Sequence, residues 1–315
     1  MATLLPLLAS REDYDTLPFE DLPAWLPGLR EILGRHGLPA DPIEAFADGE
    51  NPVFDVQGRW VVKLVPFFAA APARAEMETL EWLTRRSDVP LPRLVASGEL
   101  DGWAYFVSTR LPGRPLSRCW AELGLRDREA VTIELGTHLA ALHAIPVGDF
   151  RPAGVHWPDW HVRRRQAWTR RRDVARLSPR LRESFSAYVE SVALDRVPRR
   201  PVLLHGDLAP ENVLVEARDG AWRVSGLFDF GNAVVGEASF DFTAPTVLLE
   251  PGDGAVVRRF LGAYGWEGET MDTLRPKLMA YTLLHPMADL YDCLALLPGA
   301  HDAPSWAAVA ERFWP

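Results

Sequence analysis

The chain reads LHGDLAPENVLV from residue 204 to residue 215 and LFDFG from residue 227 to residue 231. In the first segment an acid, Asp207, follows an apolar run, and an amide, Asn212, comes five residues later. In the second segment another acid, Asp229, follows another apolar run. Any one of them alone would be an ordinary turn residue at a strand end, where Asp and Asn are common. Together with the Asp-Phe-Gly tripeptide and the apolar flanks, the spacing indicates a functional site.

Phosphoryl transfer requires such a set of side chains. One carboxylate orients the attacking hydroxyl and accepts its proton, and further oxygen ligands hold Mg²⁺ on the phosphates. The sequence therefore favours a phosphotransferase. The sequence does not support a zinc peptidase, an α/β-hydrolase or a P-loop protein, because the motifs H-E-x-x-H, G-x-S-x-G and G-x-x-x-x-G-K-[ST] are all absent from the chain.

From about Phe46 to Asp241 the chain resembles the aminoglycoside phosphotransferase and choline kinase family, which shares the protein-kinase-like fold. The resemblance is carried by the His-Gly-Asp loop with its asparagine, the Asp-Phe-Gly motif, the linker 111–113 (Leu-Pro-Gly) and Asp241. It implies transfer of the γ-phosphoryl group of ATP or GTP to a hydroxyl of a small molecule.

The resemblance also implies site roles: Asp207 as the catalytic base, and Asn212 and Asp229 as magnesium ligands. Two other readings stay open beside it. A protein kinase has little room for its activation loop, since only 15 positions separate Asp229 from the Ala-Pro pair at residues 244–245. A catalytically inactive kinase-like binding module would be expected to have lost one of the key residues, and none is missing.

The pattern of the 315 residues predicts an α+β protein with two lobes. Residues 1–40 are expected to form a helical extension, residues 41–108 a small nucleotide-binding lobe, residues 109–115 a hinge, and residues 116–315 a larger, mostly helical lobe for catalysis and acceptor binding. In the small lobe, apolar runs predict antiparallel strands at 43–47, 53–56, 60–65, 93–97 and 104–109 and one helix at 72–86. In the larger lobe the longest expected helices are 128–144 and 159–194.

A lysine in an apolar strand is the notable feature of the small lobe. Lys63 and Lys277 are the two lysines among 34 basic residues, and Lys63 lies within WVVKLV. A buried ammonium is costly without an anionic partner, which a nucleotide phosphate and a carboxylate on the following helix would supply. Glu76 shares a helix face with apolar residues and is the expected inward carboxylate. The alternative is a lysine that reaches solvent from an edge strand.

Two further segments are candidates for nucleotide contacts. Gly49 and Asn51 lie in the loop between the first two strands, where backbone donors for phosphates are expected, although G-x-G-x-x-G is absent and Pro52 has no N–H. By the resemblance, the segment containing Thr109 and Leu111 corresponds to the hinge that binds adenine. Its lack of an acid leaves the choice between ATP and GTP open.

The acceptor is expected to be a polycationic aminosugar antibiotic. The segment 236–315 holds eleven acids against five basic residues, and an acidic wall would attract ammonium groups. Glu237, Asp289 and Asp292 are the candidate acceptor contacts, the last two on a stretch, 281–296, that otherwise reads as a core stripe. Asp241 is expected to support the catalytic loop. A macrolide, an amino alcohol such as choline and a sugar metabolite remain alternatives, and aromatic residues near the C-terminus favour the macrolide.

Composition excludes several classes of protein. Two cysteines rule out a disulfide framework and a four-thiolate metal site, and a net charge of −9 argues against nucleic-acid binding. The six arginines between 163 and 172 are expected to lie on a solvated helix face. No apolar run reaches the length of a membrane span and no secretory signal is recognised, so we expect a cytoplasmic protein. We also expect it to be a monomer.

Overall fold

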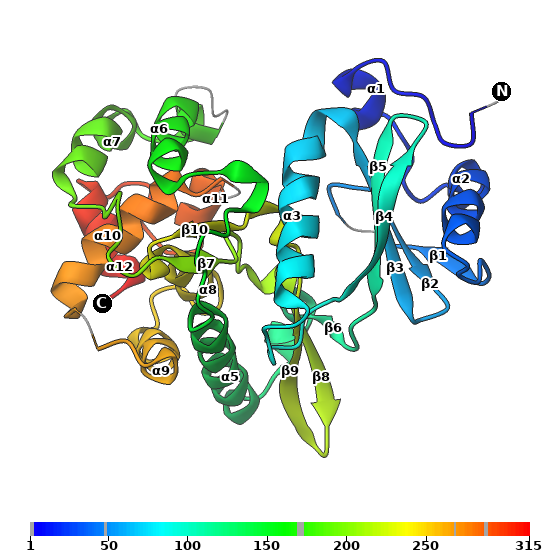
Figure 1. Cartoon of the computed structure of the whole chain (residues 1–315). Helices are drawn as coiled ribbons and strands as arrows, with labels where there is room; N and C mark the ends of the chain where they lie inside the picture. Colours follow the sequence, from blue (N-terminus) through cyan, green and yellow to red (C-terminus); the bar gives the residue numbers. More distant parts are fainter. Residues whose placement is uncertain (1–2, 47–48, 169–172, 268, 287–288) are drawn as a thin grey trace. The chain divides into compact units, whose positions relative to one another are not determined.

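The structure, a computed structural model, describes residues 3–46, 49–168, 173–267, 269–286 and 289–315. The chain divides into two compact units (Figure 1). Unit 1 comprises residues 1–86 and 90–112, and unit 2 comprises residues 87–89 and 113–315.

An antiparallel sheet with the strand order β1-β2-β3-β5-β4 forms the centre of unit 1 (Figure 1). Its strands are β1 (Ile43–Ala45), β2 (Val53–Val56), β3 (Trp60–Pro66), β4 (Leu94–Leu100) and β5 (Trp103–Thr109). The five strands expected from the sequence are present, and residue 47, the expected end of the first, lies outside the described residues. Tight turns after β2 and β4 keep neighbouring strands antiparallel, as the glycines there predict.

The two longer helices of unit 1 lie on opposite faces of this sheet (Figure 1). The helices of this unit are α1 (Arg11–Asp15), α2 (Leu22–Arg35) and α3 (Ala70–Leu83), with the 3-10 turn η1 (Phe67–Ala69) before α3. The segment 1–40, expected as an extension, contributes residues to the core: Trp25 and Leu29 of α2 are buried in one cluster with Phe54 and Trp103 of the sheet. Unit 1 therefore includes the N-terminal segment as a structural layer.

Alternation along β3 decides which side chains face α3. Val62 and Leu64 are fully buried in the cluster beneath α2. Because successive side chains of a strand point to opposite faces, Lys63 projects to the other face, where α3 lies. The apolar sequence of this strand is thus compatible with one inward lysine.

Helices make up most of unit 2. They are α4 (Leu116–Cys119), α5 (Leu125–His143), α6 (Trp157–Trp168), α7 (Pro179–Ser191), α8 (Thr243–Leu248), α9 (Gly254–Tyr264), α10 (Met271–Leu284), α11 (Leu290–Ala295) and α12 (Trp306–Phe313). Short 3-10 turns connect them: η2 (Trp120–Glu122), η3 (Pro152–Gly154), η4 (Asp173–Arg176), η5 (Pro210–Asn212), η6 (Phe230–Asn232) and η7 (Ala238–Phe242).

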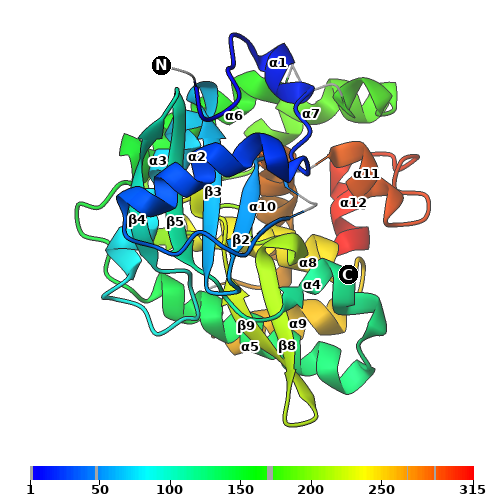
Figure 2. The ribbon, with the colours of Figure 1, turned by 90° about the vertical axis from the view of Figure 1, so that its right-hand side faces the viewer.

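Short strands in unit 2 carry the loops that the sequence marks as functional. Strands β8 (Val213–Arg218) and β9 (Ala221–Leu227) form a long hairpin, which Figure 2 shows, and β6 (Arg114–Pro115) extends it. A separate pair joins β7 (Val202–Leu204) to β10 (Val234–Gly236). The sequence did not predict β6 or β10, which are too short to show a period.

The expected helix 159–194 is wrong as one element. Within the described residues, α6 ends at Trp168 and α7 begins after Ser178, whose hydroxyl accepts the N–H of Leu181. Ser followed by Pro at the first helical position is a start signal for a new helix. Of the six arginines, 170–172 lie outside the described residues, while Arg164 and Arg165 donate to the carbonyls of Leu284 and Val189. None of the helices described is long and apolar enough to cross a membrane.

Candidate active site

Lys63 and Glu76 form an ion pair inside unit 1. The Nζ atom of Lys63 lies 2.7 Å from Oε2 of Glu76, and the two side chains are 12% and 6% exposed. Strand β3 is flanked by β2 and β5, so Lys63 is not on an edge strand, and the solubility alternative for this lysine is wrong. The pair is the one that the face of α3 predicts, and it supplies the anionic partner that a buried ammonium needs.

The loop after β1 is held by the N-terminal segment. Tyr14 donates its hydroxyl to the carbonyl of Glu50 and lies 3.2 Å from Oδ1 of Asn51. Burial raises the pKa of Tyr14 to about 12, so it remains a donor at neutral pH. Gly49 has a φ of 130°, which L side chains rarely adopt. The side-chain oxygen of Asn51 is therefore engaged within the protein, and the loop can offer an anion its backbone rather than that oxygen.

The segment around Thr109 is fixed to Arg93, the residue that precedes strand β4. The N–H of Thr109 donates to the carbonyl of Arg93 at 2.9 Å, and its hydroxyl accepts the N–H of Arg93 at 2.9 Å. A ligand cannot use that N–H without breaking the sheet. Leu111, two residues further on, is half-buried and lies beyond the last strand residue.

In unit 2, Asp241 holds the backbone of the loop that carries Asp207. Its Oδ2 accepts the N–H of His205 at 2.6 Å, and its Oδ1 accepts the N–H of Gly206 at 2.9 Å. His143 contributes a third contact, with Nε2 3.1 Å from Oδ2. The carboxylate is 1% exposed, so these bonds satisfy a charge that water cannot reach. The structural role expected of Asp241 is confirmed.

Gly206 and His205 fix the direction of the same loop. Gly206 has a φ of 84°, and a Cβ there would lie 2.0 Å from the carbonyl oxygen of Asn232, so only glycine fits. His205 contacts the carbonyl of Phe228 through Nε2 at 3.0 Å, and its Nδ1 lies 3.4 Å from the N–H of Asp207. Burial lowers the pKa of His205, which matches a neutral ring with one donor and one acceptor. His205 is structural, as expected.

Asp207 and Asn212 lie side by side at the ends of this loop. The Nδ2 atom of Asn212 donates to the carbonyl of Asp207 at 2.9 Å and lies 3.2 Å from its Oδ2. Burial, together with the nearby carboxylates of Asp229 and Glu211, raises the pKa of Asp207 to about 7, and the hydrogen bond from Asn212 acts in the opposite direction. A base whose pKa is near the working pH can accept a proton from an alcohol and return it.

The hairpin register brings Asp229 next to Asn212. Val213 at the start of β8 pairs with Leu227 at the end of β9, and the N–H of Phe228 donates to the carbonyl of Asn212 at 3.1 Å. Asp229 itself has a φ of 65°, an uncommon conformation that Asp tolerates better than most residues. Residues that are separated by the whole hairpin in sequence thus become neighbours.

The donor set of Asn212 and Asp229 suits a hard cation. Because Nδ2 of Asn212 is used toward Asp207, the amide oxygen is the atom left for a ligand, and carboxylate and amide oxygens are what Mg²⁺ prefers. No group of three or more His, Cys, Asp or Glu side chains within the described ranges could hold a metal by itself. Magnesium would then need oxygens from another source, and nucleotide phosphates provide them.

One residue near the site was read from the sequence only as part of a core stripe. His285 is buried, and its Nε2 lies 3.9 Å from Oδ1 of Asp207. The stripe 281–296 is broken there, because α10 ends at Leu284 before Pro286 and α11 begins at Leu290. Residue 288 of the stripe lies outside the described residues. The sequence does contain a signal for His285, because it is a polar residue within an apolar stripe and directly precedes a proline.

Each of the three predicted acceptor contacts has another partner. Glu237 is 12% exposed; it accepts from the hydroxyl of Tyr281 and from Ser239 at 2.9 Å. Asp289 and Asp292 lie 4.0 and 3.4 Å from Arg176. Of the eleven acids in 236–315, at least eight have a hydrogen-bond or ion-pair partner among the residues that the structure describes. The acids therefore do not form one open wall, because most are neutralised or used in structure.

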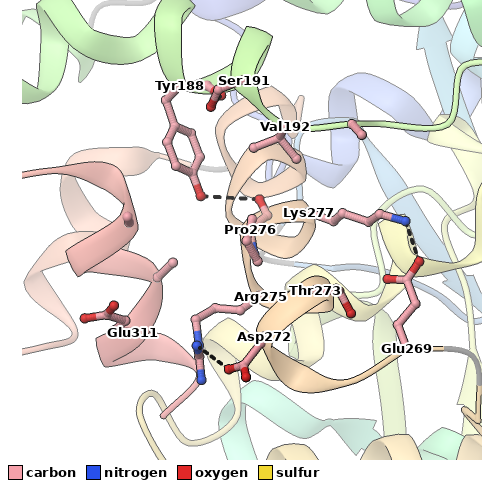
Figure 3. Close-up of a pocket in the computed structure, with 13 residues that line it drawn as sticks. Tyr188, Ser191, Val192, Glu269, Asp272, Thr273, Arg275, Pro276, Lys277 and Glu311 are labelled. Carbon is pink, nitrogen blue, oxygen red and sulfur yellow. Dashed lines mark hydrogen bonds and ion pairs between the residues drawn. The ribbon is translucent and has the colours of Figure 1, made fainter.

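A pocket of about 620 Å³ lies elsewhere in unit 2, among α7, α10 and α12 (Figure 3). Lys277 pairs there with Glu269 at 2.6 Å, and Arg275 with Asp272 at 3.3 Å. Neither Asp207 nor any other residue of the catalytic loop lines it. Its polar groups are largely paired with each other, so we assign it no role in the reaction.

His161 gives a pH-dependent contribution to stability. It is 2% exposed and both ring nitrogens are buried without a hydrogen-bond partner. Burial lowers its pKa to about 4, with Arg196 and Arg165 adding to the decrease. The unfolded chain, with a pKa of about 6.5, binds the proton first as pH falls, so stability is lost between about pH 6.5 and pH 4.

We expect this histidine to contribute about 2 kcal/mol of lost stability between pH 7 and pH 5. Urea unfolding of the wild type and of His161→Phe at both pH values measures it. The wild type should lose more stability than the variant, and parallel losses in both proteins would contradict the assignment.

Residues 42–276 match the phosphotransferase enzyme family. The chain belongs to this family. It is an O-phosphotransferase of α+β class with the kinase-like fold expected from the sequence. Among its relatives is an aminoglycoside 3'-phosphotransferase of Streptomyces fradiae, 31% identical over 248 residues that span 75% of this chain and 80% of the relative.

Two other relatives extend the comparison. A viomycin phosphotransferase of Streptomyces vinaceus is 32% identical over 68% of this chain and 77% of its own. The solved GDP complex of wild-type aminoglycoside 2'-phosphotransferase-IIIa superposes with a TM-score of 0.67 at 21% identity, covering 86% of this chain and 96% of that one. The latter likeness concerns the fold.

Proposed function

We propose that this phosphotransferase moves the γ-phosphoryl group of ATP or GTP to a hydroxyl of an aminoglycoside-like antibiotic. The observation that carries the proposal is the 31% identity to an aminoglycoside 3'-phosphotransferase across three quarters of the chain. Solved structures of the same fold include complexes with GDP and kanamycin and with streptomycin and ATP, which supports a nucleotide as the phosphoryl donor.

Asp207 is the catalytic base in this proposal. Its Oδ2 is held by Asn212, so Oδ1 is the oxygen left to accept the proton of the acceptor hydroxyl. The pKa near 7 lets the carboxylate take that proton as the oxygen–phosphorus bond forms. Asp241 holds the loop backbone, so the main chain that carries the base does not need to reorganise during the reaction.

Asn212 and Asp229 are the proposed magnesium ligands, and bound magnesium would neutralise charge on the phosphates. In unit 1, Lys63, held by Glu76, would donate to a phosphate oxygen. The backbone at Gly49 and Asn51 would approach the phosphates, and the main chain near Thr109 and Leu111 would contact the base. Because the N–H of Thr109 is used by Arg93, its carbonyl and the N–H of Leu111 are the candidate groups.

Two findings keep other acceptors in view. A viomycin phosphotransferase is as similar in identity as the aminoglycoside enzyme, at 32%. The fold is also that of a macrolide 2'-phosphotransferase from Brachybacterium faecium, with a TM-score of 0.55. Glu237, Asp289 and Asp292 could reach a cationic acceptor only by giving up their present partners.

The test is a panel of acceptors with ATP or GTP and magnesium, followed by nucleoside diphosphate release. Kanamycin, viomycin, a macrolide, choline and glucose represent the acceptor classes, and Asp207→Asn serves as the blank. We expect kcat/KM for kanamycin to exceed every other value by about tenfold or more. Turnover confined to another member of the panel rejects the aminoglycoside acceptor but keeps the phosphotransferase.

We further propose that the enzyme acts as a monomer in the cytoplasm, where ATP, GTP and magnesium are supplied. Size-exclusion chromatography with light scattering at micromolar concentration gives the mass in solution. A value near the 35.2 kDa of one chain supports the monomer, and a multiple of it rejects it.

A further inference from the structure

His285 occupies a place that its backbone fixes. It follows the last residue of α10, and Pro286 holds it in an extended conformation with φ −60° and ψ 132°. Its ring stacks on Phe240, with 5.3 Å between centroids and 7° between planes. The side chain is 7% exposed, so packing holds the plane of the ring in place.

The two oxygens of Asp207 face different partners. Asn212 lies against Oδ2 at 3.2 Å, whereas Nε2 of His285 lies 3.9 Å from Oδ1. The terminal torsion of an aspartate is broad, so a contact at one oxygen alone leaves the carboxylate free to rotate. A second polar neighbour at the other oxygen limits that rotation.

We propose that His285 is a positioning residue for phosphoryl transfer, which holds Oδ1 of Asp207 toward the acceptor hydroxyl through its Nε2. The inference rests on the proposed role of Asp207 as base. The separation of 3.9 Å exceeds a hydrogen bond, and in this proposal it shortens when the acceptor binds, as is common for catalytic contacts that are long without substrate. The acceptor hydroxyl, when it bonds to Oδ1, then arrives beside this imidazole.

The stack on Phe240 does not by itself require a histidine. A phenylalanine would fill a similar volume and could stack in the same way, and the two ring nitrogens would be lost. Nearby Phe240 belongs to η7, which also carries Asp241, so the ring joins α10 to the segment that supports the catalytic loop. The position therefore separates packing from polarity cleanly.

Three variants test the nitrogen. His285→Phe keeps the stack, His285→Gln can place an amide nitrogen where Nε2 stands, and His285→Asn is too short to do so. We expect kcat to fall about tenfold or more in the Phe and Asn variants, with the nucleotide KM changed less than about twofold, and Gln to stay within about threefold of the wild type. His161→Phe, a matched change at a buried histidine with no contact to Asp207, should leave kcat unchanged.

A double-mutant cycle completes the experiment. In an Asp207→Asn background, His285→Phe should lower kcat no further, because the group it positions is gone. Near-wild-type kcat in His285→Phe, equal losses in Gln and Asn, or a full additional loss in the double variant would each overturn the inference. If His285→Phe does not fold, the Gln and Asn pair decides alone.

The outcomes separate this inference from the proposed function. Full activity in Asp207→Asn would contradict the role of Asp207 as the base and, with it, the positioning role of His285. Loss of activity in Asp207→Asn together with unchanged kcat in every His285 variant would contradict the positioning role of His285 and leave the proposed function intact.

Discussion

Replacing Asp207 by Asn should lower kcat by about a hundredfold or more while nucleotide binding stays nearly intact. The amide keeps the shape and the contact with Asn212 but cannot accept a proton from the acceptor hydroxyl. Steady-state kinetics with saturating acceptor gives kcat, and nucleotide titration by fluorescence or calorimetry gives the binding constant. A variant with near-normal kcat would contradict the assignment of Asp207 as the catalytic base.

The same substitution should stabilise the fold. The carboxyl group has a pKa of about 7 in the folded protein and about 3.9 in an unfolded chain. As pH rises from about 4 to about 7, the carboxyl group of the unfolded chain releases its proton first. By neutral pH this group therefore lowers the free energy of unfolding by an amount on the order of a few kcal/mol. Asparagine removes that cost, because it has no charge to bury.

Thermal unfolding at pH 5 and pH 8 measures this effect. The gain of Asp207→Asn over the wild type should be larger at pH 8, where the cost is fully present. A gain that is the same at both pH values would show that the carboxyl group does not carry the raised pKa. Activity and stability would then trade against each other at one side chain, as is common for catalytic residues.

Asp229→Ala should abolish activity at every magnesium concentration, whereas Asn212→Ala should recover part of its activity when magnesium is raised. Both residues are proposed metal ligands, but a carboxylate carries a full negative charge that an amide does not. The measurement is kcat against magnesium concentration for both variants. Equal recovery of the two variants would contradict these roles.

A structural control is needed for Asn212→Ala, because its side chain also holds the carbonyl of Asp207 at 2.9 Å. Asn212→Asp keeps an oxygen for the metal and loses the donor to Asp207, so it separates the two functions of the amide. Circular dichroism and unfolding midpoints close to those of the wild type would show that the loop is intact in each variant.

The sequence by itself determined the local elements and the identity of the loop residues. Strands of unit 1 follow from short apolar runs bounded by glycine turns, and α2 follows from its helical period, because these signals act within a few residues. Glu76 was identifiable as the partner of Lys63, since the face of a helix is fixed by its 3.6-residue period.

Only the tertiary structure decided which charges are available and which are engaged. The acids of 236–315 appear in the sequence as one negative segment. In the structure, however, Arg176 pairs with Asp289 and Asp292, and the hydroxyl of Tyr281 donates to Glu237. The same holds for His285, which helical spacing assigned to a core stripe. Whether a polar group is free, paired or aimed at a reacting atom depends on contacts between residues that are distant in sequence, and a local pattern does not contain those distances.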